Sequence, residues 1–419
     1  MKRLPLFLVP LVLTIMIPVV ADGATKSITV APMTLVTRLT STDQTLGMLV
    51  KGKVIYLFGT AIGLTSSDGS DGFLQAMSGE GVVQWSLPLN GAQDEIATAA
   101  TLDAAGNIWV VGSSGMAQSA VTPKPNSTLA TSDTATSAPL NPDGVALDPV
   151  VPLRPDLTSL VLWKVSRAGL LLATYRNQMN QPVLARSAFA TTNGINIAGV
   201  ISTSSGSAGF LSRSDSGGVF SKTILIGKSD TAINAQIGKS DGSLILFGSS
   251  GETVGVAKLK GVRDGIIVPV SISGKVGTVI RSSNTMSTRT WQSATSSLFL
   301  GGYAITGSKK EAVVTKYGSK FLPTWTMRFS AAGAALTSSS PTSSFLLFSS
   351  TTAITGIKGW KPGKPTALTL AFAAKGALTG AYGASAISIP MAIGYSRDLG
   401  VVVLGRGNLG VSIFHTLTR

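Results

Sequence analysis

The chain has 419 residues, of which 44% are apolar and 13% are charged, a composition that supports a large buried core and disfavours general disorder and long amphipathic helices. Its 34 Lys and Arg against 19 Asp and Glu give a net charge of +15, which favours anionic partners. The absence of cysteine excludes disulfides and thiolate chemistry, and a single histidine, His415, leaves little for metal or general-base sites. We therefore expect no cofactor, no metal and no catalytic residue.

The N-terminus has the features of a secretory signal. Met1-Lys2-Arg3 precedes an apolar run from Leu4 to Val20, and Ala21 and Gly23 supply the small-x-small pattern that a signal peptidase prefers. We expect cleavage before Ala24 and a secreted or extracytoplasmic protein. An uncleaved N-terminal anchor is the alternative, because the run is about the shortest length that spans a bilayer.

From residue 28 onwards one pattern recurs: a turn, a β-branched apolar run of four to six residues, and a small residue, usually Gly. Consecutive copies are about fifty residues apart, with one longer interval. The seven copies are Val54 to Gly59, Ile108 to Gly112, Ile195 to Gly199, Leu244 to Gly248, Leu298 to Gly302, Phe345 to Ser349 and Val401 to Gly405.

The longer interval contains a stretch rich in Pro, Ser and Thr at about 115–157. Proline cannot donate a ladder hydrogen bond, so this stretch is predicted to be a loop insertion. Removing about 35 residues of it restores the common period. Residues 1–23 are therefore predicted to be the signal peptide or anchor, and residues 28–419 a single domain with this insertion.

Each repeat also contains a second hairpin turn, as in Ser78 to Gly81 and Arg167 to Gly169. Trp85 and Trp325 occupy matching places beyond this turn in two repeats. Four strands per repeat at this period predict an all-β fold, a β-propeller of seven four-stranded blades, with six or eight blades as alternatives.

One repeat carries a family resemblance. The segment from Asp71 to Ser114, which includes Asp94-Glu95-Ile96-Ala97 and Asp103-Ala104-Ala105-Gly106-Asn107, resembles the β-propeller repeat of exported bacterial proteins. The resemblance covers about one repeat and implies the fold and export. Because that family has no common catalytic residues, the resemblance implies no active site.

The last repeat supplies only three strands, Ile387 to Ile393, Val401 to Gly405 and Val411 to Thr418. The segment from Met33 to Leu39 alternates like a strand and is predicted to complete this blade. The N- and C-terminal strands would then close the ring and leave no long unpaired sheet edge.

In a four-stranded blade, the loop between the second and third strands and the connection between blades emerge on one face. A positive rim with an exposed indole on this face would bind an anionic group by charge and stacking. The alternative is a solvated basic loop with the indole packed on the blade edge. The candidate binding residues are Lys309, Lys310, Lys358, Trp360, Lys361 and Lys364.

Three other features are weaker candidates. The segment from Asp68 to Gly72 has the composition of a calcium loop but lacks its remaining acids, so a turn is favoured. Asp94 and Glu95 are neighbours that would point to opposite faces of a strand, which favours a turn between blades over a catalytic pair. His415 is expected to be structural.

The leading interpretation is a non-catalytic binding or scaffolding module, monomeric, with an anionic polymer or a surface protein as its partner. The alternative is a propeller enzyme, either a polysaccharide hydrolase or lyase or a quinoprotein-like oxidoreductase. Export argues against nucleic acid as a partner, and membrane contact is expected only through an uncleaved N-terminal segment. Asp, Glu and Arg side chains from three or more blades converging at the central channel would favour the enzyme.

Overall fold

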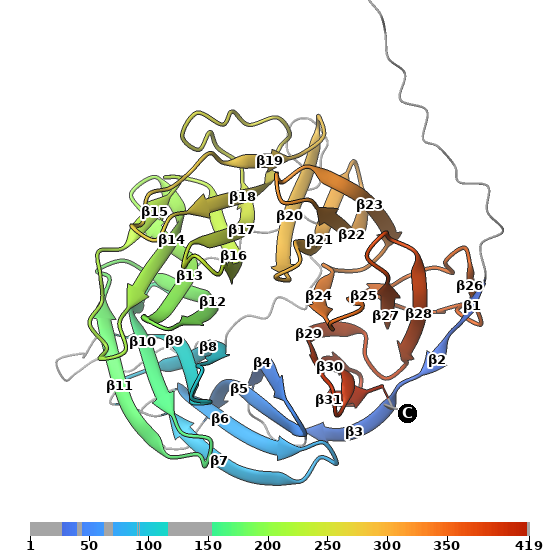
Figure 1. Ribbon diagram of the computed structural model, residues 1–419, viewed down its shortest axis with the longest axis horizontal. Helices are drawn as coiled ribbons and strands as arrows, with labels where there is room; N and C mark the ends of the chain where they lie inside the picture. The colour runs from blue at the N-terminus through green and yellow to red at the C-terminus, as the bar shows by residue number, and fades with distance from the viewer. Residues whose placement is uncertain are drawn as a thin grey trace, which may run out of the picture.

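The computed structural model describes residues 27–39, 44–62, 70–89, 91, 93–115 and 153–416. Seven sheets are arranged around a central axis, each with four strands that follow one another outward, and one of them gains a short fifth strand at its outer edge (Figure 1). The predicted seven-bladed β-propeller is thereby confirmed. The described part of the chain has no helix that is long and apolar enough to cross a membrane. The predicted signal segment, residues 1–23, and residues 116–152 of the insertion predicted at about 115–157 lie outside the described residues.

The first strand of each blade borders the axis (Figure 1). These strands carry few charges, and only one carries an acidic residue, Glu95. In blade order, the inner strands are β4 (Gln44–Lys51), β8 (Glu95–Leu102), β12 (Val183–Thr191), β16 (Thr231–Gly238), β20 (Ser287–Ala294), β24 (Leu336–Ser339) and β29 (Ile389–Ser396).

The second strands contain the seven apolar runs that define the sequence repeat. They are buried on both faces, which explains why each run is continuously apolar instead of alternating. They are β5 (Val54–Ile62), β9 (Ile108–Gly115), β13 (Gly194–Thr203), β17 (Leu244–Ser250), β21 (Phe299–Thr306), β25 (Ser344–Ser350) and β30 (Gly400–Gly407).

The third strands continue the antiparallel order, and the fourth strands form the outer edge of the ring (Figure 1). The third strands are β6 (Ser70–Ser78), β10 (Leu157–Val165), β14 (Gly206–Ser214), β18 (Asp264–Val270), β22 (Lys309–Tyr317), β27 (Thr366–Phe372) and β31 (Gly410–His415). The fourth strands are β7 (Val83–Leu89), β11 (Leu171–Gln178), β15 (Ile224–Ile226), β19 (Ile280–Ser282), β23 (Pro323–Ser330), β28 (Leu378–Ala384) and β3 (Thr34–Leu39).

The fourth strand of blade 7 comes from the N-terminus, as the sequence predicts. β3 pairs antiparallel with β31 from Thr34 opposite His415 to Leu39 opposite Val411, with a register shift between Leu35 and Thr37. Two short N-terminal strands also add to blade 6: β2 (Ala31–Pro32) pairs with β28, and β1 (Ile28–Thr29) pairs with β26 (Ile357–Lys358). The N-terminal segment thus ties blades 6 and 7 together from outside.

The alternation of strand direction gives the ring two faces. We call the face with the turns between first and second strands and between third and fourth strands the lower face. The upper face carries the loops between second and third strands and the connections between blades.

The repeated glycine at the end of the apolar run has a steric reason. In six blades the inner strand bulges by one residue opposite this glycine. The bulge brings the carbonyl of the inner strand so close that a Cβ on Gly248 would lie 1.9 Å from the main-chain oxygen of Ala232. Only glycine fits there. The extra residues of the six bulges are Leu46, Thr98, Arg186, Asn234, Gln292 and Met391.

We expect Gly248→Ala to reduce the free energy of unfolding by about 3 kcal/mol, because the new methyl group displaces the bulged backbone. Gly333→Ala is the matched control, since a Cβ at Gly333 meets nothing within 4 Å. Urea denaturation followed by tryptophan fluorescence measures both changes. An equal, small effect of the two substitutions would show that the bulge does not demand glycine.

Neighbouring blades are joined by aromatic side chains on the outer strands. Trp85 of β7 donates from Nε1 to the main-chain oxygen of Arg167 in the next blade at 3.2 Å, and Trp325 of β23 donates equivalently to Ala374 at 3.4 Å. Gly169, with φ of +82°, turns the chain directly beneath the Trp85 ring, where a Cβ would lie 2.6 Å from the indole. The matching positions of the two tryptophans in sequence therefore reflect the same contact between blades.

Candidate anion-binding site

The predicted basic rim is divided between two blades. Lys309 and Lys310 begin β22 in blade 5, where Lys309 Nζ forms an ion pair with Glu311 at 2.7 Å and Lys310 Nζ lies 4.7 Å from the centre of the Tyr303 ring. The 358–364 segment belongs to blade 6 and lies at the outer edge of the ring, where β26 pairs with β1 (Figure 1). Lys309 and Lys310 directly follow the turn between the second and third strands of blade 5, and residues 358–364 lie in the corresponding connection of blade 6, so the two segments belong to different blades.

The prediction that the indole of Trp360 is exposed is wrong. Trp360 is only 8% exposed and packs in a cluster with Phe348, Leu368 and Leu370. Its Nε1 donates to Ser350 Oγ at 3.0 Å. Burial of the large apolar surface of an indole is favourable, so Trp360 packs into the core of blade 6 although it lies in a loop. Of the predicted residues in this segment, Lys358, Lys361 and Lys364 are exposed and available to a partner.

Asp94 and Glu95 lie where the chain enters the inner strand of blade 2. Asp94 pairs with Arg154 at 2.6 Å and accepts the main-chain N–H of Ser70 at 2.8 Å. Glu95 is fully buried and pairs with Arg176 at 2.6 Å. Burial raises the pKa of Glu95, although the bond from Arg176 opposes the shift. Both carboxylates are used to join loops and strands on the upper face.

Other acidic side chains on the upper face are paired in the same way. Further ion pairs there join Arg263 to Asp230 and Arg281 to Asp264. Among the residues that the structure describes, no group of three or more His, Cys, Asp or Glu is placed to hold a metal ion. Of the calcium-loop candidate, Asp68 and Gly69 lie outside the described residues, while Asp71 is buried within β6.

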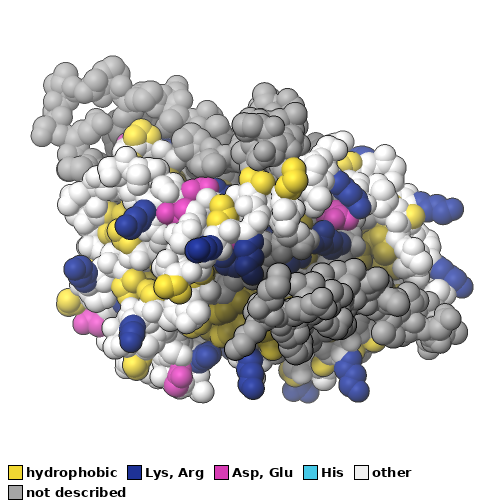
Figure 2. All heavy atoms as spheres, turned by 90° about the horizontal axis from the view of Figure 1, so that it is seen from above, with side chains coloured by type: hydrophobic (Ala, Val, Ile, Leu, Met, Phe, Trp, Pro, Cys, Tyr) yellow, Lys and Arg dark blue, Asp and Glu magenta, His cyan; other side chains and the backbone are white. Residues whose placement is uncertain are grey.

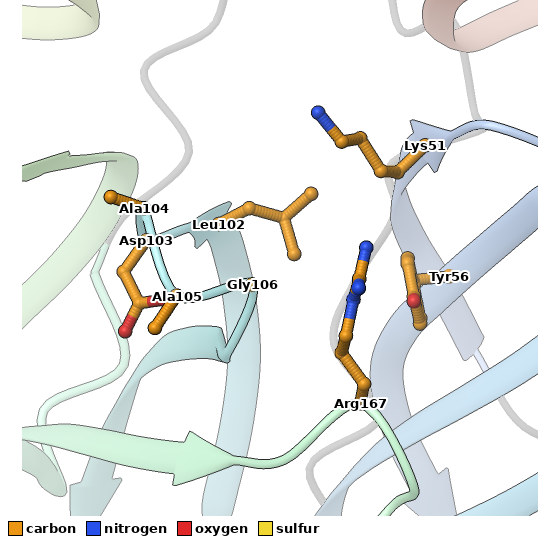
Figure 3. Close-up of a pocket in the computed structure, with 8 residues that line it drawn as sticks. All are labelled: Lys51, Tyr56, Leu102, Asp103, Ala104, Ala105, Gly106 and Arg167. Carbon is orange, nitrogen blue, oxygen red and sulfur yellow. The ribbon is translucent and has the colours of Figure 1, made fainter.

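A basic pocket lies on the lower face between blades 1 and 2 (Figure 3). Its volume is about 330 Å³. Blade 1 contributes Lys51 and Tyr56, and blade 2 contributes Arg167 and the turn from Leu102 to Gly106. These residues come from the turn after β4, from β5, from the turn after β8 and from the turn after β10, so the pocket exists only because two blades are adjacent.

Local packing fixes the position of Arg167. Its main-chain oxygen accepts the Trp85 indole N–H, and its side chain passes so close to Gly106 that a Cβ there would lie 2.9 Å from Arg167 Nε. Gly106 has φ of +84°, a conformation that the tight turn requires. The guanidinium group therefore lies between the Tyr56 ring and the Asp103 turn, with Lys51 beyond it (Figure 3).

The nearby carboxylate does not neutralise these cations. Asp103 accepts hydrogen bonds from the main-chain N and Nδ2 of Asn107 at 2.8 and 2.9 Å and from Trp109 Nε1 at 3.0 Å. Its carboxylate points away from Arg167 (Figure 3). Among the described residues, neither Lys51 nor Arg167 forms an ion pair.

The pocket therefore combines two free cations with a phenol. Burial raises the pKa of Tyr56, while the charge of Arg167 opposes this shift, so the phenol keeps its proton at neutral pH. Arginine presents a planar fork of donors that matches a carboxylate or a phosphate, and lysine adds a second charge. The arrangement suits an anionic group and offers no general base or nucleophile.

Sequence reasoning recognised both turns as hairpins but not as a site. Lys51 and Arg167 are 116 positions apart (167 minus 51) and meet only through the packing of blades. The net charge of the chain did not indicate where this site lies, because Lys and Arg side chains are spread over the surface with fewer Asp and Glu among them (Figure 2). The available signal was the position of the two residues at turns, because Lys51 lies at a turn between first and second strands and Arg167 at a turn between third and fourth strands, and alternating strand direction places both kinds of turn on the same face.

No protein-family model and no curated protein matches the chain. Among solved structures, it is similar to the α-L-arabinanase of Penicillium chrysogenum complexed with arabinobiose, at 10% identity and a TM-score of 0.44, over 76% of this chain and 92% of that chain. It is also similar to the Pan2 WD40 domain of Neurospora crassa, at 8% identity and a TM-score of 0.41, over 77% and 90%. A protein of unknown function from Dyadobacter fermentans gives 10% identity and a TM-score of 0.45, over 82% and 98%. Structural similarity at this level gives no information about activity.

Proposed function

We propose that this protein is an exported, non-catalytic binding module that holds anionic groups of a polymer or of a surface partner on its lower face. The observation that carries the proposal is the pocket between blades 1 and 2, where Lys51 and Arg167 converge without an ion-pair partner among the described residues. Two adjacent cations repel each other, and an anion placed between them relieves that repulsion.

The inner strands support binding over catalysis. Glycosidases use two carboxylates that flank the scissile bond. The seven inner strands carry one carboxylate, Glu95, which is fully buried and bound to Arg176. The described inner strands therefore do not supply the pair of carboxylates at the channel that would favour a hydrolase.

The test is binding of the chain from Ala24 onwards to an array of anionic and neutral cell-wall polymers and glycans at low and moderate salt. We expect binding to anionic polymers that weakens as salt rises. The double variant Lys51→Gln/Arg167→Gln should bind about 10-fold or more weakly, because each lost charge-assisted hydrogen bond costs about 1.5 kcal/mol or more.

The matched control is Lys361→Gln/Lys364→Gln, which removes the same charge from exposed positions on blade 6. It should bind almost as well as the unmodified chain. Equal losses in the two double variants would show that only net charge matters. Failure to bind any anionic polymer would contradict the proposal.

A further inference from the structure

The side chains of three bulge residues meet at the central axis. Arg186, Asn234 and Gln292 are the extra residues of the bulges in β12, β16 and β20, the inner strands of three consecutive blades. Arg186 Nη1 donates to Asn234 Oδ1 at 2.5 Å, and Asn234 Nδ2 donates to Gln292 Oε1 at 3.0 Å. The three inner strands border the central axis (Figure 1), so this chain of hydrogen bonds connects three blades beside the axis.

Both polar atoms of the Asn234 amide form hydrogen bonds, which hold the side chain in one orientation. Its Nδ2 also donates to the main-chain oxygen of Trp291 at 2.8 Å, and the side chain is only 8% exposed. Its Oδ1 therefore faces Arg186, and the acceptor of Gln292 is occupied. The remaining N–H donors of Arg186 and the Nε2 of Gln292 form no hydrogen bond with the described residues. The cluster is left with an excess of donors.

The charge of Arg186 is not balanced. Among the described residues it forms no ion pair, and the only acid of the inner strands, Glu95, is bound to Arg176. Burial lowers the pKa of Arg186, Tyr303 opposes this shift, and the positive charge of Arg263 adds to it. A partly buried cation without a counter-charge is costly, and arginine keeps its proton in proteins, so a bound anion would compensate this charge.

We propose that Arg186, with Gln292, forms a second binding site, for a small oxyanion such as phosphate or a carboxylate, at the central axis. The site is independent of the pocket on the lower face, because it uses blades 3 to 5 and no residue of blade 1 or 2. The guanidinium fork supplies two parallel donors to the oxyanion, Gln292 supplies a third, and Asn234 holds both side chains in place.

The experiment measures the melting midpoint of the chain from Ala24 onwards against increasing inorganic phosphate and, separately, acetate, with ionic strength held constant by sodium chloride. A ligand that binds only the folded state raises the midpoint, and we expect a rise of about 3 °C or more at saturation. Arg186→Met should abolish this rise while leaving the midpoint without phosphate equal or higher, because it removes an uncompensated charge.

Two further variants make the result decisive. Arg186→Lys keeps the charge but loses the fork, so the phosphate response should shrink without disappearing, and this variant replaces Arg186→Met if that one fails to fold. Lys51→Gln/Arg167→Gln should keep the full response, which separates this site from the proposed function. An unchanged response in the Arg186 variants, or no response to either anion in the unmodified chain, would overturn the proposal.

Discussion

A chain that begins at Gln44, and therefore lacks β3, is expected to lose its cooperative thermal transition or to melt more than about 10 °C lower, and to aggregate. Without β3 the outer edge of β31 from Val411 to His415 has no backbone partner. The truncation also removes Met33, which is buried against Val403 and Phe414 in the core between blades 6 and 7. An exposed strand edge and an opened core act together.

The matched control moves the strand instead of deleting it. A chain that begins at Gln44 and carries residues 33–39 after Arg419, through a short flexible linker, restores β3 beside β31. Thr34 lies opposite His415, so the two strands join as an ordinary hairpin. We expect this rearranged chain to recover solubility and most of the melting midpoint. A truncated chain as stable as the full one would show that β3 does not close the ring.

Trp360→Ala is expected to reduce the free energy of unfolding by about 3–5 kcal/mol, as is usual when a large buried aromatic side chain is truncated. The substitution empties space between Phe348 and Leu368, and it removes the hydrogen bond to Ser350. The substitution also removes the ring that packs on Gly383, which lies so close that a Cβ on Gly383 would be 2.8 Å from a ring carbon of Trp360. Chemical denaturation monitored by circular dichroism measures the loss.

The adjacent exposed position gives the comparison. Lys361→Ala should change stability by no more than about 0.5 kcal/mol, because the side chain is exposed. A binding role for the indole predicts the reverse for Trp360→Ala: unchanged stability and lost polymer binding. That outcome would restore the basic rim as the binding surface.

The fold was predictable because its signals are local and repeated. The apolar runs mark the second strands, whose burial on both faces demands continuous apolar sequence, and the final glycine of most runs marks the bulge in the neighbouring strand. The strand that closes the ring was also predictable, because the last repeat contains only three strands and a four-stranded blade needs a fourth from elsewhere in the chain.

The sites were not predictable in the same way, because they depend on contacts between blades. Trp360 stands among lysines in a loop, and nothing in that local composition shows that the loop folds back onto the core of blade 6. Arg186, Asn234 and Gln292 each look like an isolated polar residue in a strand. Their role emerges only when three bulges at equivalent places are brought around one axis.

The most direct test of binding at the lower face is acetylation of lysines in the presence and absence of the best anionic polymer from the array, with each modified residue quantified by mass spectrometry. Lys51 should be protected several-fold by the polymer, while Lys361 and Lys364 in the same sample should react as before. Protection of Lys361 and Lys364 without protection of Lys51 would contradict binding between blades 1 and 2 and place the partner on the outer edge of blade 6.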